Sequence, residues 1–139
     1  RELPDNLLKQ LQGWQIQDHY LPATRLRLRR MAALGGEEVL LKLGQKYRGN
    51  SLTPTETMIT NLYLNAEEYQ CLRMLSAREL CKKRYRYPFN GREFGIDVFE
   101  GPLADLILAE VEGGIVGYHT PNTSSTFHVL PLEIHINRP

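Results

Sequence analysis

Strict alternation of arginine and leucine is the feature that most constrains what this chain can fold into. From Arg25 to Arg29 every second residue is an arginine, and leucines fill the positions between them. Successive side chains of a β-strand point to opposite faces of a sheet, so Arg25, Arg27 and Arg29 are expected on one face and the leucines on the other. The segment is therefore predicted to be a strand with one charged and one apolar face.

The same period of two recurs along most of the chain and predicts a mainly antiparallel β structure. Turn-forming pairs such as Gly35-Gly36 and Asn90-Gly91 separate the alternating segments, as they do in hairpins. Strands are expected over residues 15–21, 24–31, 38–47, 56–64, 79–87, 93–100, 106–112 and 132–136. Apolar residues at helical spacing predict helices over residues 5–11 and 65–75. We expect one α+β domain over residues 1–139, with its helices outside the sheet.

Each predicted strand carries charges of one sign on one face. Lys42 and Lys46 share a face, and so do Lys82, Arg84 and Arg86. A solvated sheet face explains this pattern in any one strand. Like charges on adjacent strands repel each other, however, so the strands taken together indicate a bound anion. If the sheet closes, its charged face lines a lumen that suits phosphate, because the planar guanidinium of arginine binds two oxygens at once.

The distribution of charge matters more here than its sum. A formal net charge of +1 would by itself argue against a polyanionic ligand. However, 13 of the 17 basic residues lie between Arg25 and Arg86, and six of the 16 acidic residues lie between Glu93 and Glu112. The near balance is therefore interpreted as an anion site and a metal site that face each other.

Carboxylates of the acidic segment are candidate metal ligands. Glu110 and Glu112 share a face of one predicted strand, and Asp97 lies on the charged face of the preceding strand. Clustered carboxylates raise one another's pKa unless a cation neutralises them, and Mg²⁺ or Mn²⁺ prefers such oxygen ligands. Alternatively, Glu110 and Glu112 form ion pairs with Arg27 or Arg84 across the sheet.

Several other classes of protein do not fit the sequence. The longest apolar stretches are too short for a membrane span or a signal peptide, and a cytoplasmic protein is expected. Cys71 and Cys81 have no spacing typical of a disulfide framework or a zinc site. The basic run over residues 82–86 suggests a nucleic-acid patch, but most of its charges share one strand face and no basic helix accompanies it, which argues against nucleic acid.

A series of short motifs follows the order found in a known family. The segments that carry them are residues 24–29 (similar to RxRxR), 43–46 (LTxK), 80–85 (LxKxRY), 96–101 (xDxFxG), 109–112 (AExE) and 131–134 (a closing EVT strand). Residues 18–21 resemble the second strand of the same family. The chain thus resembles the CYTH domain of the triphosphate tunnel metalloenzymes, which include class IV adenylate cyclase, thiamine triphosphatase and bacterial inorganic triphosphatases.

This resemblance implies an eight-stranded antiparallel tunnel that binds Mg²⁺ or Mn²⁺ and holds a triphosphate-containing small molecule between basic walls. It implies that phosphate is bound by Arg25, Arg27, Lys46, Lys82 and Arg84, to which the charged strand faces add Arg29, Lys42 and Arg86. The implied metal ligands are Glu110, Glu112, Asp97 and Glu56. Asp97 and Tyr20 would also take part in catalysis, since Tyr20 resembles a tyrosine that partners a catalytic lysine in some members.

Two departures from the family pattern bear on the chemistry. The N-terminal ExExK strand, with its metal-binding glutamates and its lysine for activating water, would precede Arg1, so the domain is expected to be truncated at its N-terminus. Within residues 56–64, Glu56 alone remains of the usual alternating acids, with Met58 and Thr60 at the next positions on that face. The resemblance therefore implies a first metal site more strongly than a second.

Two functions from different classes follow. The first is divalent-metal-dependent hydrolysis of inorganic triphosphate or a related organic triphosphate. The second is a non-catalytic module that binds polyphosphate or a nucleotide in the same tunnel. The sequence leaves the oligomeric state open, a homodimer included.

Overall fold

A single β-sheet dominates the computed structural model, which describes residues 5–47, 57–111, 114–119, 128–129 and 137–138. In spatial order the described strands are β10-β4-β3-β2-β1-β5-β6-β7-β8-β9. Their bounds are β1 Gly13–Tyr20, β2 Leu26–Ala33, β3 Val39–Tyr47, β4 Thr57–Tyr63, β5 Arg78–Phe89, β6 Arg92–Phe99, β7 Ile107–Val111, β8 Gly114–His119, β9 His128–Val129 and β10 Asn137–Arg138. The helices are α1 Asp5–Leu8, α2 Ala66–Arg73 and a 3₁₀ turn over Gly101–Leu103.

Antiparallel pairing joins all the neighbouring strands except β10 and β4, which run parallel. The hairpin between β5 and β6 turns at Asn90 and Gly91, whose φ angles are +50° and +71°. Positive φ at both central residues matches the twist of the flanking strands, and asparagine followed by glycine adopts it with little strain. The predicted antiparallel α+β structure is confirmed.

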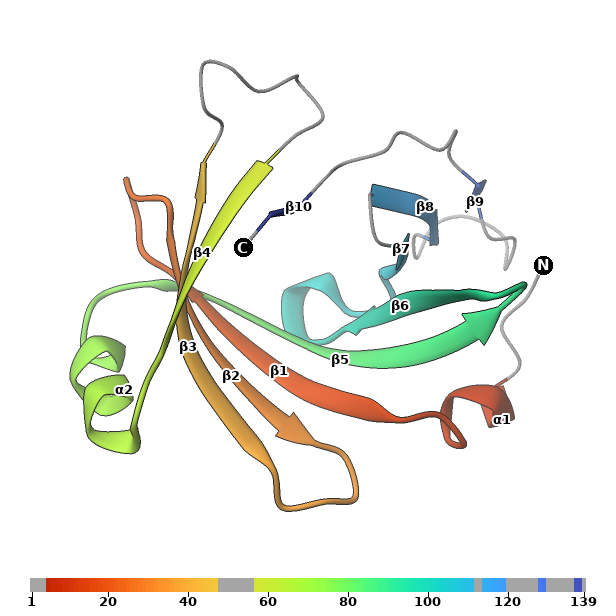
Figure 1. Cartoon of the computed structure of the whole chain (residues 1–139), viewed down its shortest axis with the longest axis horizontal. Coiled ribbons are helices and arrows are strands. Elements are labelled where there is room, and N and C mark those ends of the chain that lie inside the picture. The colour runs from red at the N-terminus through yellow and green to blue at the C-terminus, as the bar shows by residue number, and fades with distance from the viewer. Residues whose placement is uncertain (1–4, 48–56, 112–113, 120–127, 130–136, 139) are drawn as a thin grey trace.

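The sheet curls strongly, as Figure 1 shows, and it has a concave and a convex side. Helix α2 lies outside the curve, where it contacts β2 and β3. In the described ranges no pairing joins β9 or β10 to a further strand, so the described sheet is an open, curled one rather than a closed tunnel of eight strands. Closure into such a tunnel stays a prediction.

Most of the expected strands are present, with differences near the C-terminal end. Strands β8, β9 and β10 were not predicted. In β8, Gly114 and Gly117 weaken the alternation that marks a strand, and β9 and β10 contain two residues each, too few to show a pattern. The strand expected over residues 132–136 lies outside the described residues, as does the Glu56 end of the strand expected over 56–64.

Helix α2 begins where the sequence predicts, because Asn65 and Glu68 cap it reciprocally. The Asn65 side chain accepts a hydrogen bond from the Glu68 backbone at 2.8 Å, and the Glu68 carboxylate accepts one from the Asn65 backbone at 2.9 Å. The helix ends at Arg73, earlier than expected, so Leu75 lies beyond it and is 53% exposed. Among the described residues, no helix is long and apolar enough to cross a membrane.

Apolar side chains are buried on both sides of the sheet. Ile16 is fully buried on the concave side, and Leu28 and Ile96 are buried on the convex side. Tyr69 of α2 is buried where the helix covers the sheet. Buried apolar side chains therefore support the strands that carry the polar concave side.

Candidate anion site on the concave face

The strand register brings the predicted basic residues onto one face. Arg29 lies directly opposite Lys42 in the pairing of β2 with β3, and Arg27 lies opposite Gly44. Directly opposed residues of antiparallel strands share a face. The concave face, as we use the term, carries the side chains of Asp18, Tyr20, Arg27, Arg29, Lys42, Lys46, Lys82, Arg84, Asp97 and Glu110. The sharing of a face within each strand, which the sequence predicts, is thus confirmed across the sheet.

Arg29 is held by a carboxylate that the sequence reading did not select. Its Nε and Nη2 donate to the two oxygens of Asp18 at 2.6 and 2.7 Å, and both side chains are buried. Such a two-point contact fits the planar guanidinium to the carboxylate. Asp18 stands opposite Arg29 in the pairing of β1 with β2. It is also two residues before Tyr20, and alternation therefore places both on one face of β1. This spacing was the signal in the sequence that could have identified Asp18 as a site residue.

Asp97 forms the centre of a second buried cluster. One of its oxygens accepts from Lys82 Nζ at 2.6 Å and from Arg84 Nη2 at 2.8 Å, and the other accepts from Arg84 Nε at 2.6 Å. Burial by itself would raise the pKa of Asp97, but the hydrogen bonds and charges of Arg84 and Lys82 outweigh burial and lower it. Asp97 is therefore an ionised carboxylate, and both of its oxygens accept hydrogen bonds from Lys82 or Arg84.

Three further cations of the concave face have no such partner. In the part of the chain that the structure describes, no ion pair joins Arg27, Lys42 or Lys46 to an acidic residue. The buried Nε of Arg27 has no hydrogen-bond partner either. We call these three residues the unpaired trio.

The electrostatics of the unpaired trio reflect crowding of like charges. Burial, reinforced by Arg29 and Arg27, lowers the pKa of Lys42 to about 8. Burial and the charge of Arg27 likewise lower the pKa of Lys46, against an opposing effect of Glu110. The pKa of Arg27 is lowered by burial and by Arg29, which Asp18 and Tyr20 offset in part. An anion placed among these groups would relieve the repulsion.

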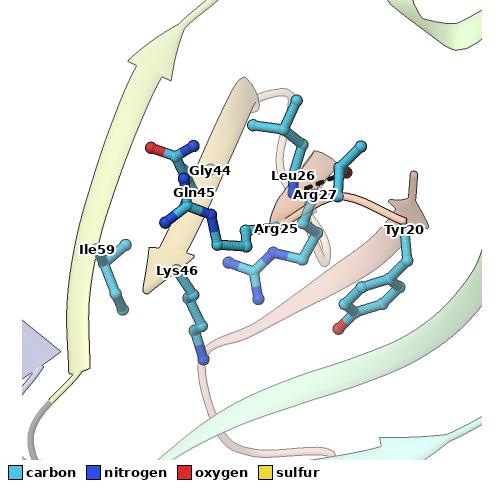
Figure 2. A pocket seen from close by; sticks show the side chains of 9 residues that line it. Tyr20, Arg25, Leu26, Arg27, Gly44, Gln45, Lys46 and Ile59 are labelled. Carbon is cyan, nitrogen blue, oxygen red and sulfur yellow. Dashed lines mark hydrogen bonds between the residues drawn. The ribbon is translucent and has the colours of Figure 1, made fainter. Parts of the chain in front are cut away.

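A pocket of about 220 Å³ opens beside two members of the trio. Figure 2 shows Tyr20, Arg27 and Lys46 around this pocket, from β1, β2 and β3 respectively. Gly44 also lines it, and a Cβ there would meet Asn61 Oδ1 at 3.2 Å and Arg27 Nη2 at 3.8 Å. The tight neighbour is therefore Asn61 of β4, whereas the distance to Arg27 is an ordinary van der Waals contact.

The remaining predicted anion ligands lie nearer the edges of the site. Arg25 is exposed and precedes β2, where it lines the same pocket. Arg86 is exposed and forms an ion pair with Glu93 at 2.6 Å, away from the trio. Tyr20, for which a catalytic role was predicted, also lines the pocket and is 40% exposed.

The predicted metal ligands differ in how well their surroundings suit a cation. Asp97 suits a direct ligand less well, because both of its oxygens already accept hydrogen bonds from protein cations. Glu110 fits better: its side chain is 38% exposed and its one ion pair among the described residues is long, at 3.4 Å from Arg84 Nη2. Glu56 and Glu112 lie outside the residues whose structure is described. The described residues contain no group of three metal-ligating side chains.

Comparisons with protein-family models, with curated proteins and with solved structures find no match for this chain. The resemblance to the CYTH domain therefore rests on the sequence motifs alone. The arrangement of charges on the concave face is independent of that resemblance, because it follows from the register of the strands.

Proposed function

We propose that this protein binds a triphosphate-containing small molecule on the concave face and hydrolyses it in the presence of Mg²⁺ or Mn²⁺. The observation that carries the proposal is the unpaired trio of Arg27, Lys42 and Lys46. Unpaired cations whose pKa values are lowered by burial and by neighbouring cations destabilise a fold, so the presence of three of them on one face favours a role in binding an anion.

The extent of the basic face supports a chain of phosphates over a single one. Its cations come from β3, β2 and β5. Because β1 lies between β2 and β5, these cations span three strand spacings, or about 14 Å. Lys42 and Lys46 stand on one side, and Lys82 and Arg84 stand on the other. In the proposal, the sheet closes into a tunnel and the phosphates lie across it.

Hydrolysis would draw on the same cations. Arg27, Lys46 and Arg84 would stabilise the negative charge that develops on the transferring phosphoryl group, which is the main catalytic contribution of such groups. Asp97 would act as a positioning residue, because it fixes Lys82 and Arg84. Glu110, with Glu112 and Glu56, would hold Mg²⁺ or Mn²⁺, which would supply further charge stabilisation. Tyr20 would contact the substrate at the pocket.

A non-catalytic module that binds polyphosphate or a nucleotide is the alternative proposal. The observation that favours it is the engagement of Asp97 by Lys82 and Arg84, which leaves Glu110 as the accessible carboxylate beside these cations in the described part of the site. In this alternative, binding requires the cations of the concave face, whereas hydrolysis also requires the metal ligands.

The experiment separates binding from turnover. Calorimetric titration of the full-length protein with inorganic triphosphate measures affinity, and phosphate release from triphosphate, ATP and thiamine triphosphate with Mg²⁺ or Mn²⁺ measures activity. We expect Arg27→Gln to weaken binding, and Glu110→Gln or Glu112→Gln to abolish metal-dependent release while triphosphate still binds. Glu79→Gln, on the convex side, is the matched control and should change neither.

Three outcomes decide between the proposals. Metal-dependent release that is lost in Glu110→Gln supports hydrolysis. Tight triphosphate binding without release by any combination of substrate and metal supports the binding module. Absence of triphosphate binding, or binding unchanged by Arg27→Gln, contradicts both.

A further inference from the structure

A second cavity, of about 450 Å³, lies between α2 and the convex side of the sheet. Gln17, Arg30 and Leu41 line it from the sheet, and Tyr69, Gln70 and Arg73 line it from the helix. It is separated from the concave face by the thickness of the sheet, because neighbouring residues such as Arg29 and Arg30 point to opposite sides. Nothing in the proposed triphosphate chemistry uses it.

Both walls of the cavity follow directly from the secondary structure. Gln17, Arg30 and Leu41 are directly opposed on β1, β2 and β3, so their side chains stand in one row. Tyr69, Gln70 and Arg73 recur at the spacing of three and four that places residues on one helix face. A helix face packed on a sheet is usually apolar. This one instead presents a phenol, an amide and a guanidinium to an arginine and an amide of the sheet.

The polar groups of the cavity lack partners of the opposite charge. Neither Arg30 nor Arg73 forms an ion pair with any residue whose structure is described, and no acidic side chain lines the cavity. Tyr69 is 2% exposed, and its hydroxyl has no hydrogen-bond partner in the described structure. A buried hydroxyl without a partner is uncommon in native proteins and calls for an explanation such as a bound ligand.

The charges around the Tyr69 hydroxyl place both arginines within electrostatic reach of it. Burial raises the pKa of Tyr69, and the strongest opposing effects come from Arg73 and Arg30. The carboxylates of Glu79 and Asp18 act more weakly. One anionic group would therefore meet two guanidinium groups and a hydroxyl donor, a combination that suits carboxylate or phosphate oxygens.

We propose that the cavity beneath α2 binds a small organic anion, with its carboxylate or phosphate between Arg30, Arg73 and the Tyr69 hydroxyl. The apolar part of the ligand would lie on Leu41 and Val39, which line the sheet side of the cavity. This site is independent of the concave face and of the triphosphate proposal.

Titrations followed by NMR test the proposal on the intact protein. Benzoate and phenyl phosphate serve as the carboxylate and phosphate probes, and inorganic phosphate serves as the probe without an apolar part. We expect saturable shifts of the backbone amides over residues 66–73 with benzoate or phenyl phosphate, at lower concentrations than inorganic phosphate requires. The stronger of the two organic probes identifies the anionic group.

Four variants, two of them controls, assign the shifts to the cavity. Arg73→Gln should weaken the organic probe at least tenfold, and Tyr69→Phe should weaken it severalfold without loss of fold, since it removes one hydroxyl. Arg92→Gln, an exposed arginine outside the cavity, is the matched control. Lys42→Met, on the concave face, should leave the α2 shifts unchanged. The proposal is overturned if neither organic probe shifts the α2 amides saturably, or if Arg73→Gln and Tyr69→Phe bind as the unaltered protein does.

Discussion

The concave face contains two groups of cations that differ in their partners. Arg29, Lys82 and Arg84 are fixed by Asp18 and Asp97 through hydrogen bonds of 2.6 to 2.8 Å. The unpaired trio of Arg27, Lys42 and Lys46 lies on β2 and β3 without a described carboxylate partner. The comparison teaches that one face can combine two kinds of cation: the paired cations are held in place by carboxylates, and the unpaired cations lack a described counter-charge, which a ligand would supply.

The largest expected effect comes from removing a carboxylate of the paired group. Asp97→Asn leaves the buried Lys82 without a counter-charge and leaves Arg84 with only its long ion pair to Glu110. We therefore expect the free energy of unfolding to fall by about 3–5 kcal/mol. Urea denaturation of the two proteins measures the difference. Glu93→Gln is the control: its ion pair with Arg86 is more than half exposed on the carboxylate side, and such pairs contribute about 0–1 kcal/mol. Similar losses in both variants would contradict the proposed division of the face.

Neutralising a member of the unpaired trio should have the opposite effect on the fold. Lys42→Met removes a charge that is repelled by Arg29 and Arg27, so the melting temperature should rise. Triphosphate affinity should fall about tenfold or more, because a charge-assisted contact is lost. Lys83→Met, on the convex side of β5, is the matched control and should leave affinity unchanged. A destabilised Lys42→Met protein, or one that binds triphosphate normally, would show that Lys42 is a framework residue.

Triphosphate affinity should also depend on pH in a way that the unpaired trio explains. The pKa of Lys42 is about 8 in the free protein, and a bound anion would raise it. Binding above pH 8 would then take up a proton, so affinity should decrease as the pH rises through about 8. Titration calorimetry at several pH values measures this slope, and Lys42→Met should flatten it. An unchanged slope in that variant would assign the effect to another group.

The smallest expected effect is on stability in alkaline solution. Lys42 has a folded-state pKa of about 8 against an ordinary value of 10.5, so the unfolded chain binds more protons between these two pH values. The contribution of Lys42 to the free energy of unfolding should therefore rise with pH across that window. Thermal melts of the unaltered protein and of Lys42→Met, compared from pH 8 upward, isolate this contribution. If the melting temperatures of the two proteins change in parallel with pH, Lys42 makes no such contribution.

Much of the fold could be predicted from local patterns. The alternation around Arg27 and Arg84 predicts strands and their two faces, and Asn65 with Glu68 predicts the start of α2. Strand β8 escaped prediction because Gly114 and Gly117 contribute no side chain to the alternation. The end of α2 at Arg73 was also missed, since the stripe of apolar residues continues past the helix.

Most residues of the candidate site could be predicted from the sequence, but the hydrogen bonds and ion pairs between them could not. The sequence places Lys82, Arg84 and Asp97 on charged faces, yet it selected Asp97 as a metal ligand and passed over Asp18. In the structure, Asp97 accepts hydrogen bonds from the two cations, and Asp18 accepts them from Arg29. The role of Asp97 as a metal ligand stays a prediction. Each partnership depends on which residues stand opposite one another on neighbouring strands.

The sequence by itself determined which side chains share a face of each strand, because a period of two is a property of the local backbone. Only the tertiary structure decided which cations are paired and which are left for a ligand, and it alone placed α2 over Arg30. Register between strands and the packing of a helix on a sheet join residues far apart in the chain. Their geometry is set by the whole sheet, so no single segment contains it.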